Sequence, residues 1–221
     1  SRDYGVKKII HTSTSEVYGS PDQIPITEKH IVSGQSPYAA SKIAADQLAL
    51  SYEKSFNLPI AILRPFNTFG PRQSARAIIP TIITQILNGN KIQLGSLNPT
   101  RDFTYVEDTV DGFIKSIFSK KNIGEIINIG SGFEISVRDL AKKIAKLMKK
   151  KISIVEKKER KRPKFSEVMR LLASTKKAKK LIKWNPKFSS KKGFDEGLKK
   201  TIKWFSKPEN LKLYKQSLYN D

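Results

Sequence analysis

The sequence predicts an α/β fold in which a parallel sheet is joined to a second, smaller α/β lobe. In the first half of the chain, strand-like apolar runs alternate with helix-like segments, as in parallel sheets whose strands are connected by helices. The runs 6–14 and 58–67 have the length and apolar content of buried strands. The second half contains helices and short strands in a less regular order, which indicates a lobe folded onto the first.

Each element of the first half has a local reason. The run 6–14 (VKKIIHTST) is predicted as a buried strand, and 38–56 as a long helix with Ala and Leu on one face. In the strand 58–67 the prolines stand near the two ends, where they fit better than in the interior. The helix 77–89 carries isoleucines at helical spacing and ends at a glycine.

The elements of the second half rest on shorter signals. Ser136 and Asp139 form a capping box that begins the helix 137–150. The other expected elements are the strands 91–95, 101–106, 125–132 and 152–156, the helix 106–118, and two Lys-rich helices that end near Pro208. The sequence shows neither an internal repeat nor a long linker between them.

The 221-residue chain is strongly basic, with a formal net charge of +22. A basic surface can bind nucleic acid, but these lysines stand beside apolar residues at helical spacing, without an aromatic platform. A solvated Lys-rich exterior is the favoured interpretation, and a polyanionic small molecule would also benefit from the field. The absence of cysteine excludes disulfides and thiolate metal sites, and no apolar run reaches the roughly 18 residues of a membrane span.

Tyr38 and Lys42 are four residues apart in the helix 38–56 and therefore lie on one helix face, one turn apart. An ammonium beside a phenol favours the phenolate, which can act as a base. Because a free phenol ionises only near about pH 10, a second positive charge is also needed, and an oxidised nicotinamide ring would supply it. This spacing is common on helices, so its meaning depends on the neighbouring motifs.

Thr14, Ser15 and Glu16 stand at the C-terminal end of the first strand, where open parallel sheets bind their ligands. A second strand ends in the run 64–72 (RPFNTFGPR), downstream of the Tyr–Lys pair. Hydroxyl groups and a carboxylate at a strand tip, close to a tyrosine and a lysine, are suited to proton transfer. The three motifs together therefore predict a catalytic site.

Five motifs occur in an order that resembles the extended short-chain dehydrogenase/reductases acting on nucleotide sugars. They are TSTSEVYG, SPYAASK, LRPFNTFGPRQ, TRDFTYVEDT and RPKFSEV. Within that superfamily the chain most resembles the NAD-dependent 4,6-dehydratases. The stretch FNTFGPRQSARAIIPTIITQIL and the C-terminal WFSKPENLKLYKQSLYN are similar to the UDP-N-acetylglucosamine 4,6-dehydratases of the legionaminic acid pathway. The resemblance implies NAD as the cofactor and a nucleotide sugar as the substrate.

The resemblance also implies the C-terminal portion of a Rossmann-type parallel sheet with a smaller substrate-binding lobe. Residues 1–74 are expected to form a partial NAD-binding domain with the catalytic residues, and 75–221 most of the substrate lobe, with 103–120 returning to the Rossmann core. The family's glycine-rich pyrophosphate turn follows no predicted strand. We therefore expect that the family's N-terminal portion is missing, and that the chain alone binds NAD poorly.

Taken residue by residue, the resemblance gives catalytic roles to Thr14, Ser15, Glu16, Tyr38 and Lys42. Tyr38 removes the O4 proton while hydride passes from C4 to NAD, Lys42 assists and holds the nicotinamide ribose, and Thr14 hydrogen-bonds O4. Glu16 takes the C5 proton, water leaves from C6, and hydride returns to C6. Ser15 stands where dTDP-glucose dehydratases have Asp, so either Glu16 or a water must return the proton to the departing hydroxyl.

The resemblance further implies cofactor contacts from Ser13 and Pro65, in addition to Tyr38 and Lys42. Substrate contacts are expected from Asn67, Arg76, Arg101, Arg162 and Glu167. The arginines would approach the diphosphate, whose geometry matches a guanidinium, and the glutamate would contact the ribose. No metal site is expected.

Other functions stay open from the sequence. A UDP-glucuronate decarboxylase would share Thr14, Glu16, Tyr38 and Lys42, but it would need a cationic partner for the sugar carboxylate. A 4-epimerase has no step that requires a base at C5. A basic nucleic-acid-binding protein with a decayed enzyme core is the alternative from a different class. The expected setting is a cytoplasmic enzyme, a homodimer when full length, without a nucleic-acid or membrane partner.

Overall fold

The computed structural model describes residues 2–161, 163, 166–212 and 214. Its first sheet has three parallel strands in the order β1-β2-β6: β1 (Ile9–Thr12), β2 (Ile60–Pro65) and β6 (Ile126–Ile129). The register pairs His11 with Ile62, and Leu63 with Ile127. Because the strands are parallel, their carboxyl ends lie at one edge of the sheet. The predicted parallel α/β arrangement is confirmed.

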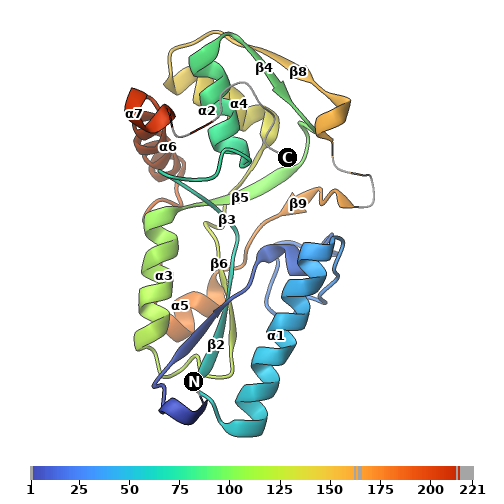
Figure 1. The fold of residues 1–221 in the computed structure, drawn as a ribbon, viewed down its shortest axis with the longest axis vertical. Coiled ribbons are helices and arrows are strands. Elements are labelled where there is room, and N and C mark those ends of the chain that lie inside the picture. Colours follow the sequence, from blue (N-terminus) through green and yellow to red (C-terminus); the bar gives the residue numbers. More distant parts are fainter. Residues whose placement is uncertain (1, 162, 164–165, 213, 215–221) are drawn as a thin grey trace.

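Helices cover both faces of this sheet (Figure 1). α1 (Pro37–Phe56) lies on one face, and α3 (Val106–Phe118) and α5 (Lys176–Ile182) lie on the other. Ser36 caps α1, because its Oγ accepts a hydrogen bond from the Ala39 N–H at 3.1 Å, and a proline occupies the first turn. Covered on both faces, β2 is an apolar run interrupted only by Arg64 before its final proline.

A second, mixed sheet lies between the first sheet and the second lobe. Its central strand is β5 (Thr100–Tyr105), and its partners are β3 (Asn67–Phe69), β7 (Glu134–Ser136) and β9 (Arg170–Leu171). The second half of β5 pairs with β3, and its first half pairs with β7 and β9. β5 then continues directly into α3, so this strand connects the two parts of the molecule.

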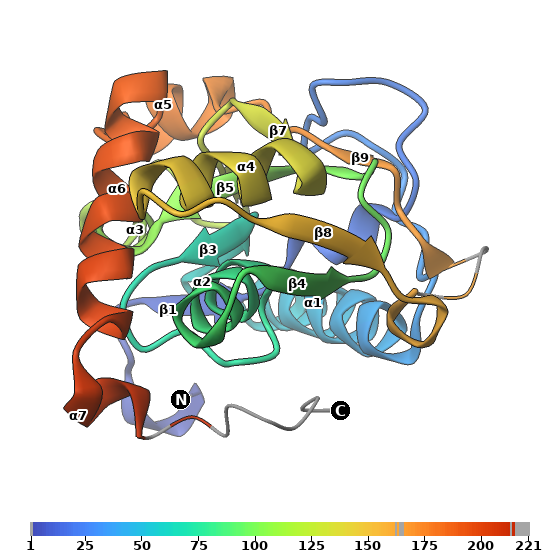
Figure 2. The same cartoon turned by 90° about the horizontal axis from the view of Figure 1, so that it is seen from above.

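The second lobe is built on a two-stranded parallel ribbon with helices beside it (Figure 2). It contains β4 (Lys91–Leu94), β8 (Ser153–Glu156), α2 (Ile78–Asn88), α4 (Val137–Leu147), α6 (Lys191–Phe205) and α7 (Pro208–Leu211). Ser136 caps α4 at the predicted position, since its Oγ accepts from the Asp139 N–H at 3.0 Å, while its hydroxyl donates to Asp139 Oδ2 at 2.7 Å. Aromatic rings fill the core, with Phe194 packed against Phe69 at 5.3 Å between ring centroids.

Some boundaries differ from the sequence expectations. The strand expected over 6–14 ends at Thr12, because the chain leaves the sheet through the 3-10 turn η2 (Ser15–Tyr18). Two further turns are η1 (Arg2–Tyr4) and η3 (Lys158–Arg160). α3 contacts β1 and β2. Because β6 pairs with β2 and α5 contacts β6, these two later elements also belong to the part of the molecule that contains the first sheet. In the described part of the chain, no helix is long and apolar enough to cross a membrane.

Candidate functional site

The turn that follows β1 carries the expected proton-transfer residues. Thr14 caps η2, because its Oγ1 accepts a hydrogen bond from the Glu16 N–H at 3.3 Å. The cap fixes the start of the turn, so the half-buried Glu16 stands just beyond the carboxyl end of β1. Ser15, between them, is only 3% exposed.

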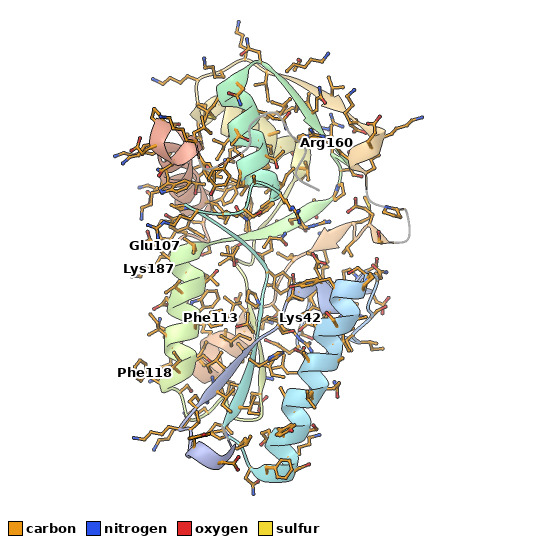
Figure 3. All side chains as sticks on the ribbon, viewed as in Figure 1. Lys42, Glu107, Phe113, Phe118, Arg160 and Lys187 are labelled. Carbon is orange, nitrogen blue, oxygen red and sulfur yellow. The ribbon has the colours of Figure 1, made fainter. Side chains whose placement is uncertain are left out.

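Tyr38 and Lys42 lie in the first turns of α1. The Lys42 Nζ donates a hydrogen bond to the Thr12 carbonyl oxygen at 2.6 Å, which holds the ammonium at the end of β1. Figure 3 shows Lys42 in the part of α1 that faces the second lobe. The Tyr38 side chain is 53% exposed, so a ligand can reach it. The helix therefore presents a phenol and an ammonium at the edge where β1 ends.

Glu16 and Tyr38 line the same cavity, which has a volume of about 400 Å³. Ser166 and Val168 close it from a segment more than 120 positions away in the sequence. The remaining walls are Gln35, Ser36 and Ala39, from the start of α1 and the loop before it. The structure thus places the carboxylate and the phenol of the predicted site around one hollow.

A second cavity of about 320 Å³ lies between the mixed sheet and the second lobe. Four of the expected substrate contacts line it: Asn67, Arg76, Arg101 and Glu167. Arg101 and Glu167 form an ion pair of 3.1 Å inside this cavity, with side chains 13% and 16% exposed. Because each side chain fixes the other, the arginine is held facing the cavity before a ligand arrives. The fifth expected contact, Arg162, lies outside the described residues.

The two cavities adjoin each other through residues 166–168. Ser166 and Val168 line the cavity of Glu16 and Tyr38, while Glu167 lines the other one. The expected site residues therefore line two hollows, one on either side of this short segment. A ligand with a sugar at one end and a diphosphate at the other has a shape that could extend across both.

The two other expected cofactor contacts have different surroundings. Ser13 is 5% exposed, and its hydroxyl donates a hydrogen bond to Asp46 Oδ2 at 2.9 Å. That hydroxyl is therefore engaged inside the protein rather than directed toward a ligand. Pro65 is half-buried at the last position of β2, at the same sheet edge as the Thr14–Glu16 turn.

Other side chains of the second cavity were not singled out from the sequence. Arg160 lines it from η3, but in the sequence it lies in a basic run that looked like solvated surface. Gly95 is needed beside it, because a Cβ there would come within 2.2 Å of the Arg160 carbonyl oxygen. Gln73 also lines the cavity, and its Oε1 is buried without a hydrogen-bond partner in the described structure.

The glycine turn after β6 is closed by a buried carboxylate. Asp102, on β5, is completely buried and accepts hydrogen bonds from the Ser131, Gly132 and Ala173 N–H groups at 2.6, 2.9 and 3.1 Å. Because these N–H groups already point at Asp102, the turn cannot offer them to a phosphate. The turn serves to join β6, β5 and the residues after β9, next to Arg101.

Asp102 should make stability depend on pH. Burial raises the pKa of Asp102 to about 6, although its hydrogen bonds act in the opposite direction. A carboxyl group whose pKa is raised on folding stabilises the protein most below its unfolded pKa, and this contribution is lost as pH rises through the folded pKa. We expect a loss of about 3 kcal/mol between about pH 4 and pH 7. Urea unfolding of the wild type at several pH values measures it.

The variant Asp102→Asn should lack this pH-dependent component, whatever its overall stability. Asp195→Asn is the matched control, since Asp195 is only half-buried and pairs with Lys143 at 2.7 Å. The comparison between variants also cancels the general effect of the large positive charge. A pH profile in Asp102→Asn that parallels the wild type would show that Asp102 does not titrate in this range.

The parallel sheet, the Thr14–Glu16 turn at its edge, and the Tyr38–Lys42 pair define an epimerase/dehydratase of the extended short-chain dehydrogenase/reductase type. The comparison with known proteins agrees with this class. A profile of the GDP-mannose 4,6 dehydratase family matches residues 1–201, and the chain belongs to this family.

Several characterised proteins are similar to the chain. A dTDP-D-glucose 4,6-dehydratase of Mus musculus is 35% identical over 209 residues, which are 92% of this chain and 57% of that protein. A dTDP-glucose 4,6-dehydratase from Streptomyces venezuelae, solved with NAD, superposes with a TM-score of 0.83 at 28% identity, covering 95% of this chain and 63% of that one. A UDP-N-acetylglucosamine 4-epimerase from Methanobrevibacter ruminantium M1, solved in complex with UDP-N-acetylmuramic acid, superposes with a TM-score of 0.82 at 30% identity. The match covers 92% of this chain and 64% of that one.

These comparisons confirm the family and the Rossmann-type fold class expected from the motifs. The chain spans less than two thirds of the length of each of these relatives. Dehydratases and epimerases of nucleotide sugars both occur among them.

Proposed function

We propose that the chain forms the catalytic and substrate-binding part of an NAD-dependent enzyme that dehydrates a nucleotide-diphosphate sugar to its 4-keto-6-deoxy form. The observation that carries this proposal is the shared cavity of Glu16 and Tyr38, with Lys42 hydrogen-bonded to the strand end beside it. Oxidation at C4 requires a base for a hydroxyl, and elimination requires a second base for a carbon acid. A 4-epimerase would use only the first of these groups.

Tyr38 and Lys42 fit the nicotinamide side of NAD, and Pro65 stands at the same sheet edge. When bound there, NAD would supply reversible hydride transfer with the sugar. Among the described residues, no strand passes through a Gly-x-x-Gly-x-x-Gly turn directly into a helix, and the turn after β6 is closed by Asp102. The residues present therefore fit only one side of the cofactor.

Three side chains act at O4 of the sugar, each in a different way. The Tyr38 phenolate takes the O4 proton, and the Lys42 ammonium stabilises the phenolate by its charge. Thr14 Oγ1 already accepts from the Glu16 N–H, so its hydroxyl hydrogen remains available to donate to O4.

Glu16 acts on the neighbouring carbon. Once C4 is a ketone, the C5 hydrogen becomes acidic, and the Glu16 carboxylate removes it as a proton. The C6 hydroxyl group receives a proton and leaves as water. Ser15 is buried, which supports the return of that proton by Glu16 or by a water rather than by the serine.

The sugar nucleotide that we propose is UDP-N-acetylglucosamine. The stretch that carries this resemblance, residues 66–87, supplies much of the wall of the second cavity, including Asn67, Gln73 and Arg76. One experiment tests both the proposed reaction and the proposed substrate. A full-length enzyme that contains this chain is incubated with NAD and with UDP-N-acetylglucosamine, dTDP-glucose, UDP-glucuronate or GDP-mannose. A 4-keto-6-deoxy product supports the dehydratase. Formation of a C4 epimer, or of a nucleotide pentose by decarboxylation, without elimination of water would overturn the dehydratase assignment. Preference for another substrate would overturn the sugar assignment.

Arg101→Ala should weaken binding of the nucleotide diphosphate. Loss of a charge-assisted hydrogen bond typically costs about 1.5–3 kcal/mol, which is roughly 10- to 150-fold in affinity. Calorimetric titration of UDP measures the change. The control is Arg138→Ala, whose arginine pairs with Glu156 at 3.7 Å and does not line the cavity. Equal UDP affinity in wild type and Arg101→Ala would remove Arg101 from the diphosphate site.

The proposal includes a cytoplasmic homodimer without a nucleic-acid partner. α1 exposes an apolar row of Leu48, Tyr52 and Phe56, at 61%, 42% and 43%, which a second copy could cover. Lysines of the second lobe and of α6 form ion pairs with acidic residues, such as Lys143 with Asp195 and Lys200 with Glu107. These pairs support a solvated basic exterior.

A further inference from the structure

A buried polar cluster adjoins the Thr14–Glu16 turn, and the proposed reaction does not use it. Asp46 lies one helical turn beyond Lys42 on α1 and is 0% exposed. Its Oδ2 accepts a hydrogen bond from the Ser13 hydroxyl at 2.9 Å, and its Oδ1 lies 3.0 Å from His11 Nε2. Because His11 and Ser13 belong to β1 and its continuation, this carboxylate connects α1 to the strand that leads into the turn.

Arg64, on β2, connects the same carboxylate to the far end of the turn. Its guanidinium donates to Asp46 Oδ2 through Nε at 3.1 Å and through a terminal nitrogen at 2.9 Å. The Arg64 Cζ also lies 4.8 Å from the centre of the Tyr18 ring, which is the last residue of η2. Arg64 is only 2% exposed, so water does not screen these contacts.

Tyr18 is held at its hydroxyl as well. The hydroxyl donates a hydrogen bond to Asn128 Oδ1, on β6, at 2.7 Å. Burial raises the pKa of Tyr18, so the hydroxyl keeps the proton that it donates. Asn128 is fixed in turn, because its Nδ2 donates to the Ile26 carbonyl oxygen at 3.1 Å. All three strands of the first sheet therefore contribute polar groups that hold the turn.

We propose that Asp46 and Arg64 are positioning residues, which set the place of the Glu16 turn relative to the Tyr38–Lys42 face of α1. The inference rests on the proposed function, because it concerns the alignment of the two proton-transfer groups of that reaction. Asp46 belongs to the helix that carries Tyr38 and Lys42, and Arg64 contacts both Asp46 and the turn. The pair is thus a direct physical link between the two halves of the site.

The burial of this ion pair supports a role beyond stability. Removing two charges from water has a desolvation cost that an apolar pair of similar size avoids, so buried pairs are often neutral or unfavourable for stability. An arginine also differs from a lysine here, because its planar group can donate twice to a carboxylate while its face contacts an aromatic ring.

The first test is hydrogen exchange in the chain itself. The double variant Asp46→Asn/Arg64→Met removes both charges together, so neither is left unpaired, and Asn keeps an acceptor for Ser13 while Met packs on the Tyr18 ring. We expect the amides of residues 13–19 to exchange at least about tenfold faster than in the wild type, with the second lobe unchanged. Arg64→Lys, which keeps the charge but not the planar contact, should show a smaller acceleration and serves if the double variant does not fold.

The matched control is Asp108→Asn. Asp108 is also a buried aspartate, but it accepts hydrogen bonds from the Lys187 and Phe188 N–H groups at 2.7 and 2.8 Å. This variant should accelerate exchange near residues 184–188 and leave residues 13–19 unchanged. Wild-type exchange of residues 13–19 in the folded double variant would overturn the inference.

The second test separates positioning from stability in a full-length enzyme that contains this chain. The double variant should slow exchange of the C5 proton about 10- to 100-fold more than it slows oxidation at C4, because misplacement by about 1 Å can cost about 100-fold in rate. Asp108→Asn should leave the ratio of these two rates unchanged. An unchanged ratio in the double variant would overturn the inference. If the wild type oxidises no nucleotide sugar, the proposed function fails, and the exchange experiment still decides whether the pair holds the turn.

Discussion

Glu16→Gln should stop the reaction after oxidation of the sugar while leaving the oxidation itself intact. Glutamine keeps the volume and hydrogen-bonding shape of the side chain but cannot remove a proton from carbon. Oxidation at C4 depends on Tyr38 and Lys42, so NADH absorbance should still appear in a full-length enzyme. Loss of a positioned general base typically lowers the rate about 10²- to 10⁴-fold, and we expect this loss for removal of the C5 proton. Solvent deuterium exchange at C5 measures that step.

Glu107→Gln is the control for this prediction. Glu107 is an exposed glutamate at the start of α3 (Figure 3), where it pairs with Lys200. It lines neither cavity. Formation of 4-keto-6-deoxy product at the wild-type rate by Glu16→Gln would show that Glu16 is not the C5 base. Failure of the folded variant to form NADH would give the same conclusion. The Thr14–Glu16 turn would then serve only to bind substrate.

Tyr38→Phe should block the earlier step. Phenylalanine keeps the ring but has no hydroxyl to take the O4 proton, so NADH should not accumulate on a stopped-flow time scale. A reduction of about 10²- to 10⁴-fold in the rate of C4 oxidation is expected. UDP affinity should remain at the wild-type value, because Tyr38 does not line the second cavity.

Tyr52→Phe provides a matched change on the same helix. Tyr52 is 42% exposed and its ring lies 5.3 Å from that of Phe56, away from the cavity of Glu16 and Tyr38. It should oxidise the sugar at the wild-type rate. Rapid formation of NADH by Tyr38→Phe would contradict the assignment of Tyr38 as the O4 base, and with it the proposed use of the Tyr–Lys spacing.

The candidate site was predictable where its residues form short local patterns. The four-residue spacing of Tyr38 and Lys42 sets their common face by helix geometry alone. The Thr14–Glu16 turn follows an apolar strand, and its position at the sheet edge follows from the parallel order of the strands. Arg101 and Glu167 were expected near the substrate from ordered motifs, although their direct pairing was not.

Asp46, Arg64 and Arg160 show where local patterns fail. An aspartate in a helix is normally solvated and an arginine in a strand is ambiguous, so neither reveals a buried pair until α1 packs on the sheet. Arg160 lies in a run of basic residues whose members look alike in sequence. Its backbone approaches Gly95 closely and its guanidinium donates a hydrogen bond to the Gln93 carbonyl oxygen at 2.7 Å, and these long-range contacts place it on the cavity wall.

The sequence by itself determined the parallel α/β pattern, the main helices, the cap of α4 at Ser136, and the candidate proton-transfer groups. Each of these depends on residues within a few positions of one another, where the periodicity of side chains and hydrogen bonding of the backbone act directly. The tertiary structure alone decided that two cavities meet at residues 166–168, and that Asp46 and Arg64 lie beneath the turn. These features join segments far apart in the sequence, so they depend on how β5, β9 and the sheet pack, which no local pattern encodes.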